Sequence, residues 1–246
     1  MPNWSSNSLN IVKATDEQLD KIVAAVTAGR FLHEYVAEPD WANMPNEDGV
    51  YPGPRYRSKW LRTQTFEGKQ IWRCQSNVTC RRFPDGSADE RWYRWRNSHE
   101  GWGTKWEITD PEISRDGQSF ELSFLTAWCP PNTPWFAALS RAMPQATITC
   151  SFNEPGCDFF GVIYAKDGRA SVRYATLSDV RDSCWKQHFS KDDFAIYKDE
   201  DHELHDEVFE KFNDYWWDNE GEVLAEAVQP MIDEMISELE VPLVVK

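Results

Sequence analysis

The fold is decided by residues 5–29, SSNSLNIVKATDEQLDKIVAAVTAG, where a strand pattern passes directly into a helix pattern. Alternation over residues 5–13 predicts a strand with one buried face. Thr15 and Gln18 have the spacing of a capping box, so a helix is expected to begin there, and Gly29 is expected to end it. The apolar residues between these signals recur at helical spacing: Leu19, Ile22, Val23 and Val26.

Segments after residue 100 complete an order of elements that is typical of one topology. We predict strands at 104–109 and 119–127 around Asp116-Gly117, a helix capped by Thr133, and a strand at 146–153. The core then reads strand, helix, strand, strand, helix, strand, which is the split βαβ or ferredoxin-like order. The predicted fold class is therefore α+β, with an antiparallel ferredoxin-like domain over residues 1–175 and a long insertion at about 40–100.

Two hairpins and a helical C-terminus complete the expected elements. The hairpins are predicted at 59–66/69–78 and at 159–165/169–175, and helices at 88–97, 178–189 and 203–217. A final helix is predicted after Asn219-Glu220-Gly221, and Pro230 is expected to kink it or split it. Residues 176–246 are interpreted as an acidic helical extension of the core.

The net charge of −15 is unevenly distributed along the chain. Residues 55–98 carry 11 Lys or Arg and 4 Asp or Glu, a balance of +7. Residues 199–246 carry 2 and 16, a balance of −14. Such asymmetry indicates either a charged partner or the neutralisation of one segment by the other within the fold.

Three stretches carry a resemblance to a known family. They are Met1-Pro2-Asn3-Trp4 followed by Asn7; Trp92-Tyr93 and Trp95 leading into residues 102–106; and residues 126–131 with Glu154-Pro155-Gly156. In this order they resemble the YubB-like, ferredoxin-like family of uncharacterised proteins. The resemblance implies a ferredoxin-like fold and carriage by plasmids, phages and genomic islands, and it supplies no catalytic residues. Many relatives have a cysteine after the N-terminal Asn-Trp, where this chain has Ser5.

The acidic C-terminus has three interpretations. It forms a solvated helical face, it neutralises the basic insertion, or it imitates the phosphate array of a nucleic acid and binds a positively charged protein groove. Because the resemblance points to a mobile element, the leading hypothesis is a non-catalytic interaction protein that binds a host or element protein, in one version as an acidic, nucleic-acid-mimicking inhibitor of host defence. The candidate binding residues are Glu203, Asp206, Glu207, Glu210 and Asp214.

The insertion supports an alternative function, nucleic-acid binding. Basic residues interleaved with aromatic rings hold phosphates and stack bases. The candidate residues are Arg91, Arg94, Arg96, Lys105, Trp92 and Trp95. The competing interpretation is structural, with the tryptophans inward and the arginines outward. Trp102 and Trp106 are likewise expected to fill the core from one strand face, with Gly103 permitting a close backbone approach.

Signatures of known enzymes, metals and cofactors are sparse. The sequence lacks a Gly-x-Ser-x-Gly elbow, a glycine-rich phosphate loop and a His-Glu-x-x-His motif. A second alternative is a hydrolase that uses the turn residue Cys157, although reactive cysteines need an electropositive setting. Cys184 and His188 share a helix face but supply only two of the four ligands of a closed zinc site. We expect no cofactor, no metal and no membrane partner, reduced thiols and a cytoplasmic location.

Overall fold

The computed structural model describes the chain except residues 1–2, 54–55, 67–68, 118, 200–201 and 241–246. For the strands within residues 56–80 it describes the backbone bounds and pairing only.

The core has the ferredoxin-like order that the sequence predicts. Its elements are β1 (Trp4–Val12), α1 (Asp16–Thr27), β4 (Thr109–Asp116), β5 (Ser119–Ala127), α4 (Thr133–Ala142) and β6 (Thr147–Glu154). The four strands pair antiparallel in the order β4-β5-β1-β6, so the first strand lies between the third and the fourth, as in a split βαβ unit. A hairpin of β7 (Phe159–Lys166) and β8 (Arg169–Ala175) extends this sheet beyond β6. The α+β fold class is confirmed.

Local signals explain where the core elements begin. The Thr15 hydroxyl accepts a hydrogen bond from the Gln18 amide (3.3 Å), and the Gln18 side chain accepts one from the Thr15 amide (2.9 Å), which is the expected capping box. Gly29 follows α1 with a positive φ of 63°, as a helix end requires. Both ends of the helix therefore form as predicted.

Two boundaries in the core differ from the prediction. The strand expected at 104–109 begins only at Thr109, because residues 102–106 form an irregular segment instead. The cap of α4 is Asn132 rather than Thr133: its side-chain oxygen accepts from the Trp135 amide (2.9 Å), and its amide group donates to carbonyls of the 98–101 loop. These contacts with distant residues fix Asn132 at the cap position.

One face of the sheet carries the main hydrophobic core. The helices α1, α2 (Phe31–Tyr35) and α4 cover it. The strands contribute alternate apolar residues, and Trp102 and Trp135 are fully buried among them. The Trp135 indole donates to the Leu32 carbonyl (2.9 Å), so even its polar atom is satisfied. A β-carbon at Gly103 would come within 2.7 Å of Asn132, which confirms the expected close approach. Trp106 is only half-buried.

The other face of the sheet is polar over β1 and is covered only at one edge. The outward residues of β1 include Ser6 and Ser8, which are exposed. Over β7, by contrast, Val162 and Tyr164 are buried beneath the C-terminal helix, where Met235 packs on them. The helical extension is thus anchored on the β7–β8 edge.

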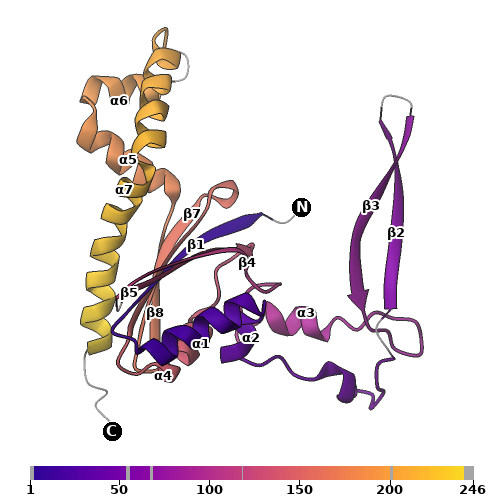
Figure 1. The fold of residues 1–246 in the computed structure, drawn as a ribbon. Helices are drawn as coiled ribbons and strands as arrows, with labels where there is room; N and C mark the ends of the chain where they lie inside the picture. Colours follow the sequence, from indigo (N-terminus) through magenta and orange to yellow (C-terminus); the bar gives the residue numbers. More distant parts are fainter. Residues whose placement is uncertain (1–2, 54–55, 67–68, 118, 200–201, 241–246) are drawn as a thin grey trace.

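The C-terminal extension consists of α5 (Leu177–His188), α6 (Lys191–Tyr197) and α7 (His205–Glu240). The prediction of two helices after residue 203 is wrong, because α7 runs unbroken through Gly221 and Pro230. A proline inside a helix costs about 3 kcal/mol. Val223 and Met235 are buried on either side of Pro230, and this packing offsets that cost. Figure 1 shows α7 running from the sheet up to α5 and α6.

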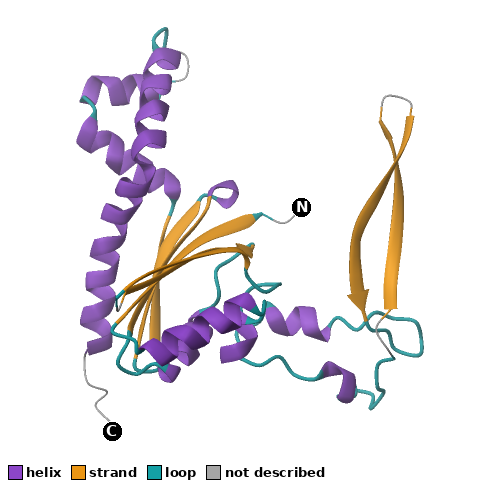
Figure 2. Ribbon diagram, in the orientation of Figure 1, coloured by secondary structure: helices purple, strands orange, loops and turns teal. Residues whose placement is uncertain are grey.

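The insertion contains η1 (Trp41–Asn43), β2 (Tyr56–Phe66), β3 (Lys69–Cys80) and α3 (Arg91–Arg96). The strands β2 and β3 pair with each other in a separate two-stranded sheet. Figure 2 shows this hairpin, which we call the β-arm, standing apart from both groups of helices. The acidic helices lie on the opposite side of the molecule, so the acidic segment does not cover the β-arm. Within the part of the chain that is described, none of the helices is both long and apolar enough to cross a membrane.

Candidate functional site

The C-terminal helices build a compact aromatic unit that positions the acidic residues. We call residues 177–228 the helical head. The Trp185 ring stacks on Phe189 (4.7 Å between centroids) and on Tyr197 (4.5 Å), and Phe212 of α7 packs against it at 4.4 Å. Trp185 and Phe212 are fully buried. One face of α7 is therefore packed against this aromatic cluster, and the opposite face of the helix is held in a fixed position on the surface of the head.

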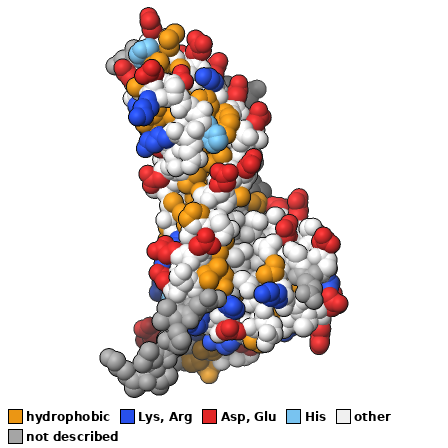
Figure 3. Space-filling model, turned by 90° about the vertical axis from the view of Figure 1, so that its left-hand side faces the viewer, with side chains coloured by type: hydrophobic (Ala, Val, Ile, Leu, Met, Phe, Trp, Pro, Cys, Tyr) orange, Lys and Arg blue, Asp and Glu red, His pale blue; other side chains and the backbone are white. Residues whose placement is uncertain are grey.

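All five predicted acidic residues lie on the surface of this head. Glu203 precedes α7, and the four others occupy its first turns at helical spacing: Asp206, Glu207, Glu210 and Asp214. Each is exposed, and none forms an ion pair with a Lys or Arg that the structure describes. Asp206 lies 3.4 Å from His205. Figure 3 shows carboxylates spread over this upper part of the molecule.

The charge density along α7 is high. Residues 206–222 contain seven carboxylates and one lysine, a balance of −6. They span about 24 Å at the rise of an α-helix, which gives one net charge per about 4 Å. A single strand of duplex DNA carries one charge per about 3.4 Å. The helix therefore approaches the linear charge density of one nucleic-acid strand.

Exposed apolar side chains interrupt the acidic face. Leu204, Phe209 and Trp217 are 45%, 41% and 69% exposed. Trp217 lies three residues after Asp214 and seven after Glu210, so helical spacing places a large ring on the same side of α7 as these carboxylates. Protein interfaces are typically built this way, with an aromatic residue at the centre and charges around it.

Two pockets border the head. One, of about 280 Å³, lies beneath Trp217 between α7, α5 and the end of the sheet, and Ser6, Asn153 and Arg181 line it. The Arg181 guanidinium lies 4.7 Å from the centre of the Trp216 ring. This pocket joins the acidic helix to the polar face of the sheet.

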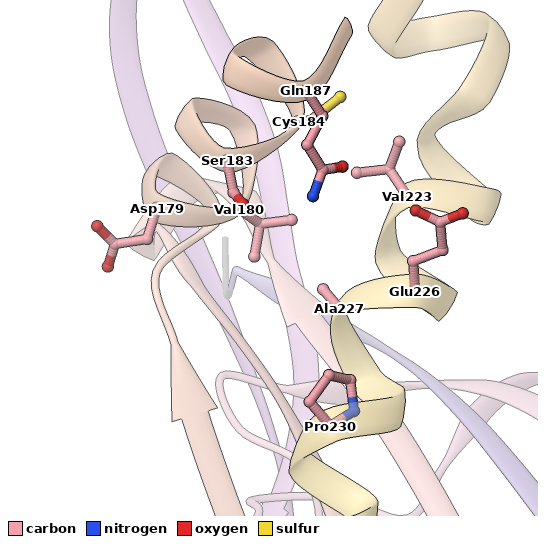
Figure 4. Close-up of a pocket in the computed structure, with 9 residues that line it drawn as sticks. All are labelled: Asp179, Val180, Ser183, Cys184, Gln187, Val223, Glu226, Ala227 and Pro230. Carbon is pink, nitrogen blue, oxygen red and sulfur yellow. The ribbon is translucent and has the colours of Figure 1, made fainter.

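The second pocket, of about 290 Å³, lies between α5 and α7 (Figure 4). Val180, Val223 and Ala227 supply apolar surface to it, and Figure 4 shows the Asp179 carboxylate directed away from the gap. Cys184 also lines it, and burial raises the pKa of its thiol. No group of three potential metal ligands occurs among the residues that the structure describes.

The predicted basic site is only partly available. Arg91 pairs with Asp89 at 2.8 Å and donates to the carbonyls of Trp41, Met44 and Pro45. Arg96 pairs with Glu38 and lies over the Trp102 ring at 4.6 Å. Both guanidinium groups therefore hold the insertion together.

Of the other predicted basic and aromatic residues, Arg94 alone is exposed. Arg94 is exposed and has only a 3.6 Å contact with Glu90. Lys105 lies over the rings of Tyr93 (4.8 Å) and Trp106 (4.7 Å). Trp92 and Trp95 are half-buried, and Trp95 packs on Trp102. Arg94 and Lys105 thus differ from Arg91 and Arg96, which are held in close internal ion pairs.

Cys157 lies at the end of the sheet in η2 (Pro155–Cys157). A hydrogen bond to the Glu154 carboxylate raises the pKa of this thiol, although Asn3 donates to its sulfur (3.4 Å) and opposes the shift. The raised pKa favours the thiol over the nucleophilic thiolate. This setting therefore lacks the activation that a cysteine hydrolase needs.

The three stretches that carry the family resemblance converge on this same end of the sheet. The Trp128 amide donates to the Asn3 carbonyl (2.9 Å), and the Thr104 hydroxyl donates to the Ala127 carbonyl (3.0 Å). Beneath them is a buried polar layer that the sequence reasoning missed: the side chains of Ser5, Asn7 and Glu154 each leave one buried polar atom without a hydrogen-bond partner. The order of the motifs was the only signal of this convergence.

A family model agrees with the ferredoxin-like architecture. The model of a family described as the ferredoxin-like domain in Api92-like protein matches residues 101–224. The crystal structure of protein api92 from Yersinia pseudotuberculosis aligns with 71% of this chain and 99% of its own, with a TM-score of 0.39 and 12% sequence identity. None of the curated proteins gives a significant match.

Proposed function

This chain belongs to the family of Api92-like proteins with a ferredoxin-like domain, and from that premise we propose that it is a non-catalytic interaction protein whose helical head binds a basic surface of another protein. One observation carries the proposal. The head exposes Glu203, Asp206, Glu207, Glu210 and Asp214 without Lys or Arg partners among the described residues, and the ring of Trp217, three residues after Asp214, is exposed as well.

The chemistry of this surface defines the partner. Unpaired carboxylates attract Lys and Arg and accelerate encounter, whereas affinity comes mainly from apolar groups that become buried. Trp217 supplies such a group, and the pocket beneath it offers a place for a partner side chain. The partner is therefore a protein with a basic groove, of the kind that holds a nucleic-acid strand.

We propose that the chain is a YubB-like protein of a plasmid, phage or genomic island, acting in the cytoplasm on a host or element protein. In that setting the acidic head occupies a nucleic-acid groove of a host defence protein and inhibits it. The charge density of α7, close to that of one DNA strand, supports this version.

Two other functions have weaker support. Nucleic-acid binding by α3 would use Arg91 and Arg96, which are already engaged in internal ion pairs. Hydrolysis through Cys157 would need a thiolate, whereas the neighbouring carboxylate raises the pKa of that thiol.

The experiment is affinity capture from a bacterial lysate, with and without nuclease. The native chain is compared with a head variant, Glu203→Gln, Asp206→Asn, Glu207→Gln and Glu210→Gln. The matched control removes the same charge elsewhere on the surface, through Glu17→Gln, Glu100→Gln, Glu112→Gln and Asp116→Asn. We expect a nuclease-resistant, salt-sensitive partner that the control retains and the head variant loses.

The captured partner is then purified and titrated against both variants. A partner that binds the head variant and the native chain equally well contradicts the acidic surface. Recovery of nucleic acid in place of a protein favours the insertion instead. Neither result depends on the identity of the partner being known in advance.

A further inference from the structure

The pocket of about 280 Å³ beneath Trp217 contains a cation that the fold leaves without a partner. Arg181 of α5 is half-buried, and its guanidinium lies 4.7 Å from the centre of the buried Trp216 ring. Its Nε atom is buried without a hydrogen-bond acceptor, and the guanidinium forms no ion pair with any residue that the structure describes. A buried donor without an acceptor is destabilising, and more so when it is charged. An anionic ligand in the pocket would compensate this charge.

Two carboxylates line the same pocket. Asp158 follows η2, and its Oδ1 atom accepts a hydrogen bond from the Ser178 amide (2.9 Å). Glu220 comes from α7 and is half-buried. Neither carboxylate forms an ion pair with Arg181 or with another Lys or Arg in the described part of the chain. The pocket thus combines one cation with two anions, and all three lack an ionic partner among the described residues.

The other lining residues supply hydrogen-bonding groups and apolar surface. Ser6 on β1 and Asn153 on β6 are direct partners in the sheet, and both line the pocket. Trp217 is 69% exposed, and Leu177 is buried at the start of α5. Small-molecule sites typically combine apolar and aromatic walls with a few polar groups, and a volume of about 280 Å³ lies at the small end of their range. The pocket therefore suits a small, charged ligand.

We propose that this pocket binds a free basic α-amino acid, such as arginine or lysine. At neutral pH such a ligand carries one carboxylate and two cations, which complement the one guanidinium and two carboxylates of the pocket. Arginine side chains bind carboxylates with strong, well-oriented hydrogen bonds, so Arg181 pairs with the carboxylate of the ligand. Asp158 and Glu220 pair with its α-ammonium group and its side-chain cation, and the ring of Trp217 offers a face on which a cation binds favourably.

This inference goes beyond the proposed function, because a side chain of a protein partner has no free carboxylate to pair with Arg181. The acidic face of α7 also favours a ligand with a net positive charge. Residues 206–222, three of which line the pocket, carry a balance of −6, and such a potential raises the local concentration of cations. An amino acid with an uncharged side chain would leave one of the two carboxylates of the pocket unpaired.

The test is isothermal titration calorimetry of the full chain with L-arginine, L-lysine and three analogues. Agmatine lacks the carboxylate of arginine, N-acetyl-arginine lacks its α-ammonium group, and norleucine lacks the side-chain cation of lysine. We expect each analogue to bind roughly tenfold or more weakly than its parent amino acid, because each leaves one charged group of the pocket unpaired. An analogue that binds as tightly as its parent overturns the proposal, as does the absence of binding by arginine and lysine at millimolar concentrations.

Variants connect the binding to these side chains. Arg181→Gln should bind arginine roughly tenfold or more weakly than the native chain does, yet bind agmatine equally well, because only the carboxylate contact is lost. A variant with a misfolded pocket would lose both ligands, so this comparison separates binding from folding. Glu220→Gln should weaken arginine and agmatine alike, whereas Glu222→Gln, an exposed control on the same helix outside the pocket, should bind both as the native chain does. Unchanged arginine affinity in Arg181→Gln and Glu220→Gln overturns the proposal.

The helical-head variant distinguishes this site from the proposed protein interaction. None of its four substitutions, at Glu203, Asp206, Glu207 and Glu210, changes a residue that lines the pocket. This variant should therefore retain most of its affinity for arginine while it loses the protein partner. Because one binding activity can be lost without the other, the two proposals fail or succeed separately.

Discussion

The helical head and the β-arm are opposites in charge and in the way they are held. In the head, an aromatic cluster around Trp185 supports α7, and the far end of α7 packs on β7 and β8. In the β-arm, each strand has only the other strand as its partner. The head thus exposes carboxylates on a rigid support, whereas the arm carries a basic sequence on a marginal one. Rigid support lowers the entropy cost of binding, while a marginal element gains stability from its ligand.

The largest expected effect tests whether the aromatic cluster is what holds the head. Trp185→Ala removes a fully buried ring, and such truncations cost about 3–5 kcal/mol. We expect residues 177–228 to lose hydrogen-exchange protection, with the β-arm unchanged. Trp217→Ala is the control, because this ring is exposed and its loss should alter stability by about 0.5 kcal/mol or less. If residues 177–228 keep their hydrogen-exchange protection in the Trp185→Ala variant, the aromatic cluster is not what holds the head together.

A smaller effect is expected at the junction of head and sheet. Arg173 on β8 pairs with Glu234 (3.2 Å) and with Glu238 on the last turns of α7. Partly exposed pairs of this kind stabilise by about 1 kcal/mol or less each. Arg173→Ala should therefore increase hydrogen exchange in residues 228–239 by about tenfold, and leave α5 and α6 protected. Uniform loss of protection would show that α7 and the sheet unfold as one unit.

The start of α6 gives a pH-dependent test of the head. Ser190 caps this helix, and its hydroxyl donates to the Asp193 carboxylate (2.7 Å), which lowers the pKa of Asp193 below its usual value. A carboxyl group with a lowered pKa stabilises the fold above its unfolded pKa, and this contribution disappears as the pH falls through the lowered value. Ser190→Ala should cost about 1 kcal/mol at pH 7 and less at pH 3, as measured by urea unfolding. A cost that is equal at both values contradicts the role of Asp193.

The smallest effect is expected from removing the β-arm. Replacing residues 56–80 with a short Gly-Ser linker should shift the melting temperature of the remaining protein by no more than about 2 °C, because the arm shares no sheet with the body. A large loss of stability would mean that the arm supports the core, and the contrast with the head would then fail.

Much of the fold follows from short-range signals in the sequence. The capping box at Thr15 and the Asp167-Gly168 turn appear where they were predicted, because each is satisfied by its own neighbours. The predicted boundaries at Thr109 and Asn132 were wrong, and at Asn132 the contacts that fix the cap join residues about 30 apart. The continuity of α7 through Gly221 was also missed, and of the two outcomes expected at Pro230 the split does not occur, because helix propensity alone does not take account of buried residues such as Val223 and Met235.

The candidate site shows the same difference between features set by neighbouring residues and features set by distant contacts. The exposed face of α7 was predicted because helical spacing alone places Glu207, Glu210 and Asp214 together. The engagement of Arg96 was not foreseen, because its partner Glu38 lies 58 residues away. The polar layer of Ser5, Asn7 and Glu154 depends on how β1 and β6 pair in the sheet. This pairing register could not be predicted from the sequence.

The placement of the two charged elements has a further consequence. Because the acidic α7 and the basic β-arm stand at opposite ends of the view in Figure 1, the molecule has a large electric dipole moment directed from one to the other. Such a body turns as it diffuses toward a charged target, so its encounters begin with a preferred orientation. Added salt shortens the range of this torque. A polyanion thus approaches the β-arm first and a polycation approaches α7 first. The charge distribution therefore selects the end of the molecule that faces each target before any contact forms.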